Sequence, residues 1–203
     1  MKVDLKAEIV SYRARAGIIS VVDVPPLQYL AIDGAGDPNT AAAYSEAVST
    51  IFAVAYRVKF FSKRELDRDY VVMPLEALWW SDDMATFTDA RDKSRWSWTA
   101  LNLVPDWITA EQVDRAVSGA DAAAVPARAG LRLETLREGR CVQTLHVGPY
   151  DAEGAALAEM HDEFIPAQGL RMTGRHHEIY LSDVRRTDPE KLKTILRQPV
   201  TAA

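Results

Sequence analysis

QYLAIDGAGDP, residues 28–38, is a short apolar run that ends in a cluster of turn residues. Runs of this kind form strands, and the Gly, Asp and Pro residues that follow end them. Asn39 or Thr40 is placed to cap a helix from Ala41 to about Val58, where apolar residues recur at helical spacing. The first half of the chain is therefore expected to open with a strand and a helix.

The same order recurs in the second half of the chain. QTLHVG at residues 143–148 echoes residues 28–33, and a helix is expected from Asp151 to Phe164. Two further strands are expected in each half, at residues 70–80, 95–104, 176–183 and 191–198. Strand–helix–strand–strand, occurring twice, predicts two α+β halves with a ligand cleft at their interface.

The 203 residues are enough for one domain or for two small ones. We interpret residues 1–203 as a single domain with approximate halves 20–108 and 131–199. A helix and linker at 109–130 join the halves, with Thr109 as the helix cap. Residues 82–94 are expected to form a polar connection between two strands.

Composition narrows the classes of partner. The net charge is −5 and no long basic run occurs, so we expect no direct nucleic-acid partner, and the acidic balance favours cationic ligands. The single cysteine, Cys141, cannot form an internal disulfide and is expected to be a small buried hydrophobe. No signal peptide and no apolar run of membrane-spanning length is visible, so a cytoplasmic protein without a membrane partner is expected. The sequence leaves the oligomeric state open.

The tryptophans form a second pattern. All five lie in or near strand-like stretches: Trp79, Trp80, Trp96, Trp98 and Trp107. Residues two apart on a strand face the same side, so Trp96 and Trp98 share a face, whereas Trp79 and Trp80 point to opposite faces. Trp80 shares its face with Glu76, which favours it for a cleft, while Trp79 packs in the core or reaches the cleft edge. Such rings either fill a core or line a pocket for a flat, apolar or cationic molecule.

HHEIYL, residues 176–181, is the segment most suited to chemistry. On a strand, His176, Glu178 and Tyr180 share one face, and the more apolar set His177, Ile179 and Leu181 is expected under the helices. The first set then faces a cleft or solvent. A glutamate beside a tyrosine can offset a ligand's positive charge or act as a general acid or base.

Neither a metal nor a cofactor is expected. His176 and His177 are neighbours on a strand and point opposite ways, so they cannot readily chelate one ion, and no HExxH spacing or cysteine cluster occurs. His146, in LHVGPY, either faces the same cleft or is a hydrogen-bonded structural histidine. No nucleotide-binding motif or serine-nucleophile motif is present.

Together these motifs resemble the GyrI-like small-molecule-binding family, in particular its stand-alone, full-length subfamily. The resemblance covers nearly the whole chain and includes VDVPPLQYLAIDGAGDPN, MPLEALWW, WSWTALNLVPDWI, LHVGPYDAEG and HHEIYLSDVRRTDPEKLKTILRQPV. It implies an α+β fold made by pseudo-two-fold duplication of SHS2-type β-α-β-β modules, with a ligand cleft between the halves. No helix-turn-helix segment is present, so the chain is not expected to be a DNA-binding regulator itself.

The resemblance also suggests a site and an activity. Glu178 corresponds by motif position to a glutamate that contacts cationic drugs in related regulators. The stand-alone subfamily includes cyclopropanoid cyclopropyl hydrolases, which open cyclopropane-bearing DNA-alkylating natural products in an aromatic cage, here matched to Trp80, Trp96, Trp98 and Tyr180. Glu178 and Tyr180 are the catalytic candidates. The ligand-binding candidates are Trp80, Trp96, Trp98, Glu76, Trp79, Trp107, His146, Tyr150 and His176.

The expected partner is thus a small-molecule xenobiotic or drug-like ligand, with no cofactor. A flat electrophile would stack between indoles while water adds to its strained ring with help from Glu178 and Tyr180. Two alternatives stay open: a non-catalytic protein that binds or sequesters such molecules, and a gyrase-inhibitor-type interaction protein.

Overall fold

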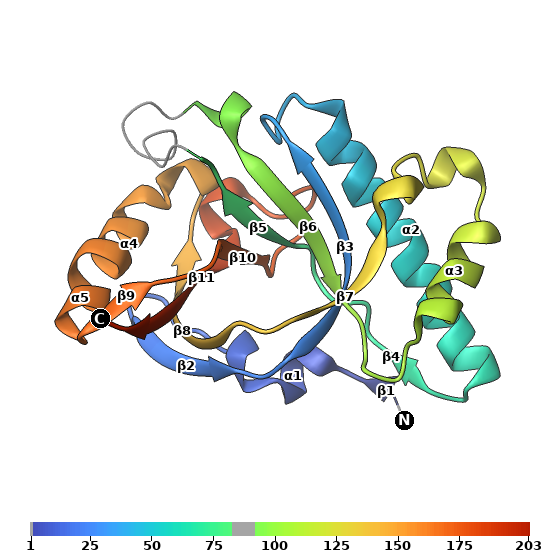
Figure 1. Ribbon diagram of the computed structural model, residues 1–203, viewed down its shortest axis with the longest axis horizontal. Coiled ribbons are helices and arrows are strands. Elements are labelled where there is room, and N and C mark those ends of the chain that lie inside the picture. The colour runs from blue at the N-terminus through green and yellow to red at the C-terminus, as the bar shows by residue number, and fades with distance from the viewer. Residues whose placement is uncertain (1, 83–91) are drawn as a thin grey trace. The chain divides into compact units, whose positions relative to one another are not determined.

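The strand expected at QYLAID is present as β3 (Leu27–Ala35), and the helix after it as α2 (Ala42–Glu65), in the computed structural model (Figure 1). The structure describes residues 2–82 and 92–203. Residues 83–91, most of the polar connection expected at 82–94, lie outside the described residues. α2 continues past Val58, where the apolar spacing loosens, as far as Glu65.

The chain divides into two compact units. The first comprises Met1–Glu8 and Leu27–Leu136, and the second comprises Ile9–Pro26 and Arg137–Ala203. Each unit is α+β, with an antiparallel sheet and helices.

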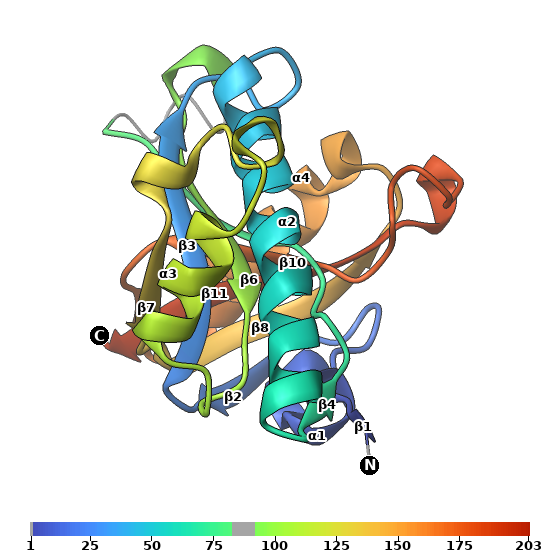
Figure 2. The same ribbon diagram turned by 90° about the vertical axis from the view of Figure 1, so that its right-hand side faces the viewer.

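In the first unit the strand order is β5–β6–β3–β7, with all neighbours antiparallel. The bounds of the elements not yet given are β1 (Lys2–Val3), α1 (Leu5–Glu8), β4 (Asp69–Tyr70), β5 (Glu76–Trp80), β6 (Ser97–Leu103), α3 (Ala110–Ser118) and β7 (Arg132–Leu136). β1 and β4 form a separate parallel pair. Leu30 of β3 packs with Val54 and Val58 of α2, so α2 covers one face of the sheet (Figure 2). The predicted cap of α3 is present, because Thr109 accepts from the backbone N–H of Gln112 in a capping box.

In the second unit the order is β2–β8–β11–β10, and β9 pairs with another part of β11. The bounds are β2 (Ser20–Val24), β8 (Gly139–Val147), α4 (Gly154–Ala158), α5 (Ile165–Ala167), β9 (Leu170–Met172), β10 (His176–Tyr180) and β11 (Lys193–Ala202). A π-helix, Glu159–Phe164, joins α4 to α5. Its Met160, with Ile165, packs on Val142 of β8 and Leu196 of β11, so these helical turns cover one face of the sheet.

Both units pair their strands in the same order. In the first unit β3 pairs with β6 and β6 with β5, and in the second β8 pairs with β11 and β11 with β10. The helix follows the first strand in each case, as α2 after β3 and as α4 after β8. The repeated strand–helix–strand–strand order inferred from the sequence is therefore present within each unit.

The second unit encloses an ion cluster of Glu138, His177 and Arg197. His177 Nδ1 lies 3.0 Å from Glu138 Oε1, and Arg197 Nη1 donates to Glu138 Oε2 at 3.1 Å. Arg197 also donates to Gln143 and to the Ser11 carbonyl. Burial alone would raise the pKa of Glu138, but His177 and Arg197 outweigh it and lower that pKa to about 2. The cluster is therefore buried, and each charged side chain in it has a partner of opposite charge.

Two further sequence expectations concern the setting of Cys141 and the presence of membrane-spanning helices. Cys141 is fully buried on β8, and burial raises the pKa of its thiol to about 12, so it behaves as a small hydrophobe. Within residues 2–82 and 92–203, no helix is both long and apolar enough to cross a bilayer.

Candidate functional site

β10 brings His176, Glu178 and Tyr180 to one face of the second unit's sheet. Glu178 lies opposite Leu196 and Tyr180 opposite Thr194, and paired residues of antiparallel strands project to the same side. Leu196 belongs to the core packed by Met160 and Ile165. The face carrying Glu178 is therefore the face that the helical turns of this unit cover.

The expectation for the other face of β10 was wrong. His177 and Ile179 were expected under the helices, but His177 projects to the opposite side, beside Arg197 in register and Glu138 in contact. The sequence placed this set under the helices because two of its three members, Ile179 and Leu181, are apolar. The partners that allow His177 to be buried are distant in sequence, so the alternation within HHEIYL could not show them.

Glu178 and Tyr180 form a direct pair. The Tyr180 hydroxyl donates to Glu178 Oε2 at 2.6 Å, a short charge-assisted hydrogen bond. The Glu178 side chain keeps 15% of its exposure, so its carboxylate is partly shielded yet reachable. The other carboxylate oxygen, Oε1, lies 3.6 Å from His176 Nε2. One oxygen is thus fixed by the phenol, and the other is directed at an imidazole.

Tyr150 extends this pair. Its ring meets the Tyr180 ring edge-on, with centroids 5.5 Å apart, and it remains 37% exposed. Burial, followed by the negative charges of Glu153, Glu178 and Asp183, raises the pKa of Tyr150 to about 12. Tyr150 therefore keeps its proton at neutral pH and remains a hydrogen-bond donor beside the carboxylate.

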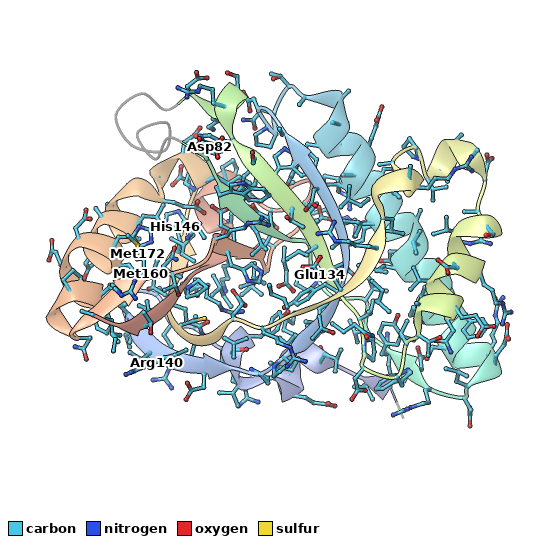
Figure 3. The ribbon with its side chains drawn as sticks, in the orientation of Figure 1. Asp82, Glu134, Arg140, His146, Met160 and Met172 are labelled. Carbon is cyan, nitrogen blue, oxygen red and sulfur yellow. The ribbon has the colours of Figure 1, made fainter. Side chains whose placement is uncertain are left out.

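His146 continues the same row across the sheet. It lies opposite Thr194, which in turn lies opposite Tyr180. Its Nε2 lies 3.1 Å from the Pro149 carbonyl, so it has the structural hydrogen bond that the sequence left open. A groove of about 260 Å³ beside it is lined in part by Thr144, Ala156 and Glu159. Figure 3 labels His146 on β8 and Met160 on the π-helix.

The first unit carries an aromatic cluster of Tyr44, Trp79, Trp96 and Trp98. Trp79 of β5 and Trp98 of β6 are directly opposite each other. Tyr44 of α2 lies 5.8 Å from the Trp79 ring and 5.0 Å from the Trp98 ring, and Trp96 lies 5.7 Å from Trp79. Trp79 and Trp98 are only 6% and 1% exposed, whereas Trp96 is half-buried. The cluster is thus core at one end and accessible at Trp96.

Trp98 fits only because of Gly34. Gly34 lies opposite Trp98 on β3, and a Cβ at Gly34 would meet the Trp98 ring at 2.1 Å. The sequence interpretation assigned Gly34 to a turn, but here its missing side chain makes room for an indole.

The remaining first-unit candidates lie apart from the aromatic cluster. Trp80 and Glu76 project from the opposite face of β5, and Glu76 is fully buried. Trp107 donates to the Ser62 hydroxyl at 3.0 Å and lies under the Arg68 guanidinium. The sequence grouped Trp80 with Trp96 and Trp98, but the pairing of Trp79 with Trp98 places Trp80 on the other face of the sheet.

The two strand glutamates also differ in setting. Glu76 projects away from α2, because its neighbour Ala77 shares the α2 face with Trp79. Glu178 projects toward the helical turns of its own unit. The units thus match in element order, while Glu76 and Glu178 are not equivalent positions.

Three residues that sequence reasoning missed complete these groups: Tyr44, His161 and Thr194. Tyr44 was visible as part of the helical apolar spacing, but its contact with tryptophans of other strands was not. His161 reaches His176, with ring centroids 5.8 Å apart, from a π-helical turn that the local sequence does not signal. Among the described parts of the chain, no group of three His, Cys, Asp or Glu side chains is arranged to hold a metal ion.

Comparison with known proteins places these observations in context. Residues 19–201 match the family model described as a GyrI-like small molecule binding domain. An uncharacterized conserved protein from Listeria innocua is 40% identical, with a TM-score of 0.88, covering 98% of this chain and 100% of that one. A hydrolase from Listeria innocua is 38% identical, with a TM-score of 0.87, covering 99% and 100%.

A more distant relative shares only the fold. The C-terminal domain of EcmrR shares the fold at 12% identity, with a TM-score of 0.59 and coverage of 92% of this chain and 98% of that one. A search of curated proteins found no significant match.

Proposed function

The chain belongs to the family of GyrI-like small molecule binding domains, and from that premise we propose that it hydrolyses a strained, electrophilic ring in a flat hydrophobic or cationic xenobiotic. The family match over residues 19–201 also supports treating the chain as one functional domain. A relative described as a hydrolase, 38% identical over 99% of this chain, supports an enzyme rather than a passive binder.

The observation that carries the proposal is the Glu178–Tyr180 pair. A carboxylate with one oxygen fixed by a phenol at 2.6 Å holds its second oxygen in a defined direction. A positioned carboxylate of this kind can orient a water molecule and accept its proton. Glu178 is therefore the proposed general base, and Tyr180 the residue that fixes its orientation.

The proposed reaction adds one water to a cyclopropane conjugated to a carbonyl. The water oxygen forms a bond to a ring carbon while the ring C–C bond breaks, and the electron pair of that bond passes to the carbonyl oxygen. Glu178 takes the proton that water loses, and this proton then passes to the oxygen that gains negative charge, which restores the carboxylate. Tyr150, which keeps its own proton at neutral pH, is the proposed hydrogen-bond donor to that developing charge.

The aromatic cluster is the proposed ligand-binding surface of the first unit. Trp96 is its accessible member, and the buried Trp79 packs edge-on against Trp96. Flat rings of this kind stack on flat or cationic ligands and contribute about 0.5–2 kcal/mol per contact.

The test is the variant Glu178→Gln. It keeps the size and hydrogen-bonding capacity of the side chain but removes the base, so tryptophan fluorescence should still report ligand binding while turnover falls about 100-fold or more. Glu190→Gln, an exposed substitution in the same unit, is the matched control. Unchanged turnover in Glu178→Gln would reject the catalytic role.

The second candidate function is binding without chemistry. A shielded carboxylate with two neighbouring phenol rings also suits a lipophilic cation, whose charge Glu178 would offset. In that case Glu178→Gln weakens the binding of cationic ligands and leaves the binding of neutral ones unchanged, and no product forms with the native protein.

A further inference from the structure

The π-helix Glu159–Phe164 carries a histidine that the function above does not use. The backbone N–H of Ile165 bonds to the Met160 carbonyl, which is the wide hydrogen bond of a π turn. Met160 and Ile165 are both buried in the core, so the turn is anchored at these two residues. Such turns insert one residue into a helix and are frequent at functional sites. Here His161 lies one residue after Met160 and meets His176 edge-on, at 80°.

Buried polar side-chain atoms surround the contact between the two histidines. Within the described residues, His161 Nε2, both ring nitrogens of His176 and Thr194 Oγ1 are buried and make no hydrogen bond. Buried polar atoms nearly always have a partner, and where protein supplies none, an ordered water or a ligand does. His176 Nε2 lies 3.6 Å from Glu178 Oε1, just beyond hydrogen-bond length. A small rearrangement would bring the imidazole within hydrogen-bond distance of the carboxylate.

We propose that His176 is a second proton acceptor of the site, reached through Glu178, and that His161 is the positioning residue that holds its ring. The inference rests on the proposed hydrolysis. Water gives its proton to Glu178 Oε1 as its oxygen bonds to the ring carbon, and Glu178 passes the proton to His176 Nε2. The imidazolium then returns a proton to the oxygen of the opened ring, so that the balance is one water added and the site restored.

The surroundings of His161 disfavour its charged form. Burial, followed by the proximity of His176, lowers the pKa of His161 to about 4, although Asp162 opposes this effect. His161 is therefore neutral at pH 7 and acts by packing. Among the described residues, the charged or titratable groups near the two rings are Glu178 and Tyr180 on β10 and Asp162 on the π-helix. Tyr150 meets the Tyr180 ring, and Glu153 lies near Tyr150.

Chemical rescue tests the role of His176. His176→Ala should lower kcat about 100-fold while KM changes by less than about threefold. Added imidazole should then raise the kcat of this variant at least about tenfold. Glu178→Ala should respond to formate instead. Native-like kcat in His176→Ala, or a loss that imidazole leaves untouched, would overturn the proposal. If His176→Ala does not fold, His176→Asn, which keeps a polar side chain, takes its place and must show the same kcat loss.

His161 has its own pair of variants. His161→Ala should lower kcat about tenfold, and His161→Phe, which keeps a flat ring but no ring nitrogen, should restore it. Equal losses in both variants would overturn the positioning role.

A measurement without substrate separates this inference from the proposed function. The chain has four histidines, so ring ¹⁵N signals can be assigned by single substitutions. The His176 signals should move in Glu178→Gln, because the proton link is lost. Unchanged signals refute the link. If the signals move in Glu178→Gln but the native protein hydrolyses no substrate, the link between Glu178 and His176 is supported and the proposed function is refuted.

Discussion

Gly34→Ala should destabilise the protein through a single contact, with Trp98. The added Cβ would lie 2.1, 2.2 and 2.7 Å from three atoms of the Trp98 ring, far inside the contact distance of two carbons. Trp98 is 1% exposed and packed against Tyr44, so its ring has no free space to enter. Either the indole leaves its position or the β3–β6 pairing opens at its end.

The expected cost follows from overpacking. Forcing a methyl group into a filled core costs about 1–3 kcal/mol of the free energy of unfolding. For a chain of this length each kcal/mol lowers Tm by roughly 2–4 °C, so Gly34→Ala should lower it by about 2–12 °C.

Urea denaturation followed by tryptophan fluorescence measures this loss. Gly130→Ala is the matched control in the same unit, because its added Cβ would meet only Ile32 at an ordinary 3.6 Å. A second arm places Gly34→Ala in a Trp98→Phe background, where the smaller ring leaves room and the added cost should fall below about 1 kcal/mol. A stability of Gly34→Ala equal to the native protein, or an equal cost in both backgrounds, would refute the packing argument.

Three further predictions concern the two units. Tyr180→Phe removes the hydrogen bond to Glu178 and should lower kcat about 10- to 100-fold in steady-state kinetics, and an unchanged kcat would contradict it. The pKa of Glu138 is about 2, below its ordinary 4.5. The contribution of ionised Glu138 to the free energy of unfolding is therefore present above about pH 5 and lost as the pH falls toward about 2. Urea denaturation across that window should show a shallower loss in Glu138→Gln, and equal slopes would count against the ion cluster. Trp96→Phe should abolish most of the ligand-induced fluorescence change and Trp107→Phe should leave it intact, whereas the reverse pattern would move the binding surface to Trp107.

Local patterns in the sequence predicted most of the fold. Turn residues after QYLAID, helical spacing in α2 and the echo at residues 143–148 were enough to place β3, α2 and β8. Strand and helix periodicities depend on neighbouring residues, so they can be read from one chain. Strand ends were less well placed: β11 starts at Lys193 and runs to Ala202, because its pairing with β9 extends it.

The site was harder to predict because it depends on contacts between distant residues. That Glu178 and Tyr180 share a face followed from alternation, and the structure adds their hydrogen bond. Two contacts decide that the face carrying Glu178 lies under the helical turns: the pairing of Glu178 with Leu196, and the ion pair of His177 with Glu138 on the other side. No local sequence pattern shows either contact. Strand register likewise decided that Trp80 lies on the other face of the sheet from Trp98. The contact of His161 with His176 depends on a π turn.

Catalysis of ring opening by this chain can be measured directly. The purified protein should be mixed with an excess of a cyclopropane-bearing alkylator and followed by liquid chromatography with mass detection. A ring-opened product that has gained one water should form over many turnovers per protein molecule. Compound that remains intact, or product formed no faster than in buffer, would contradict it.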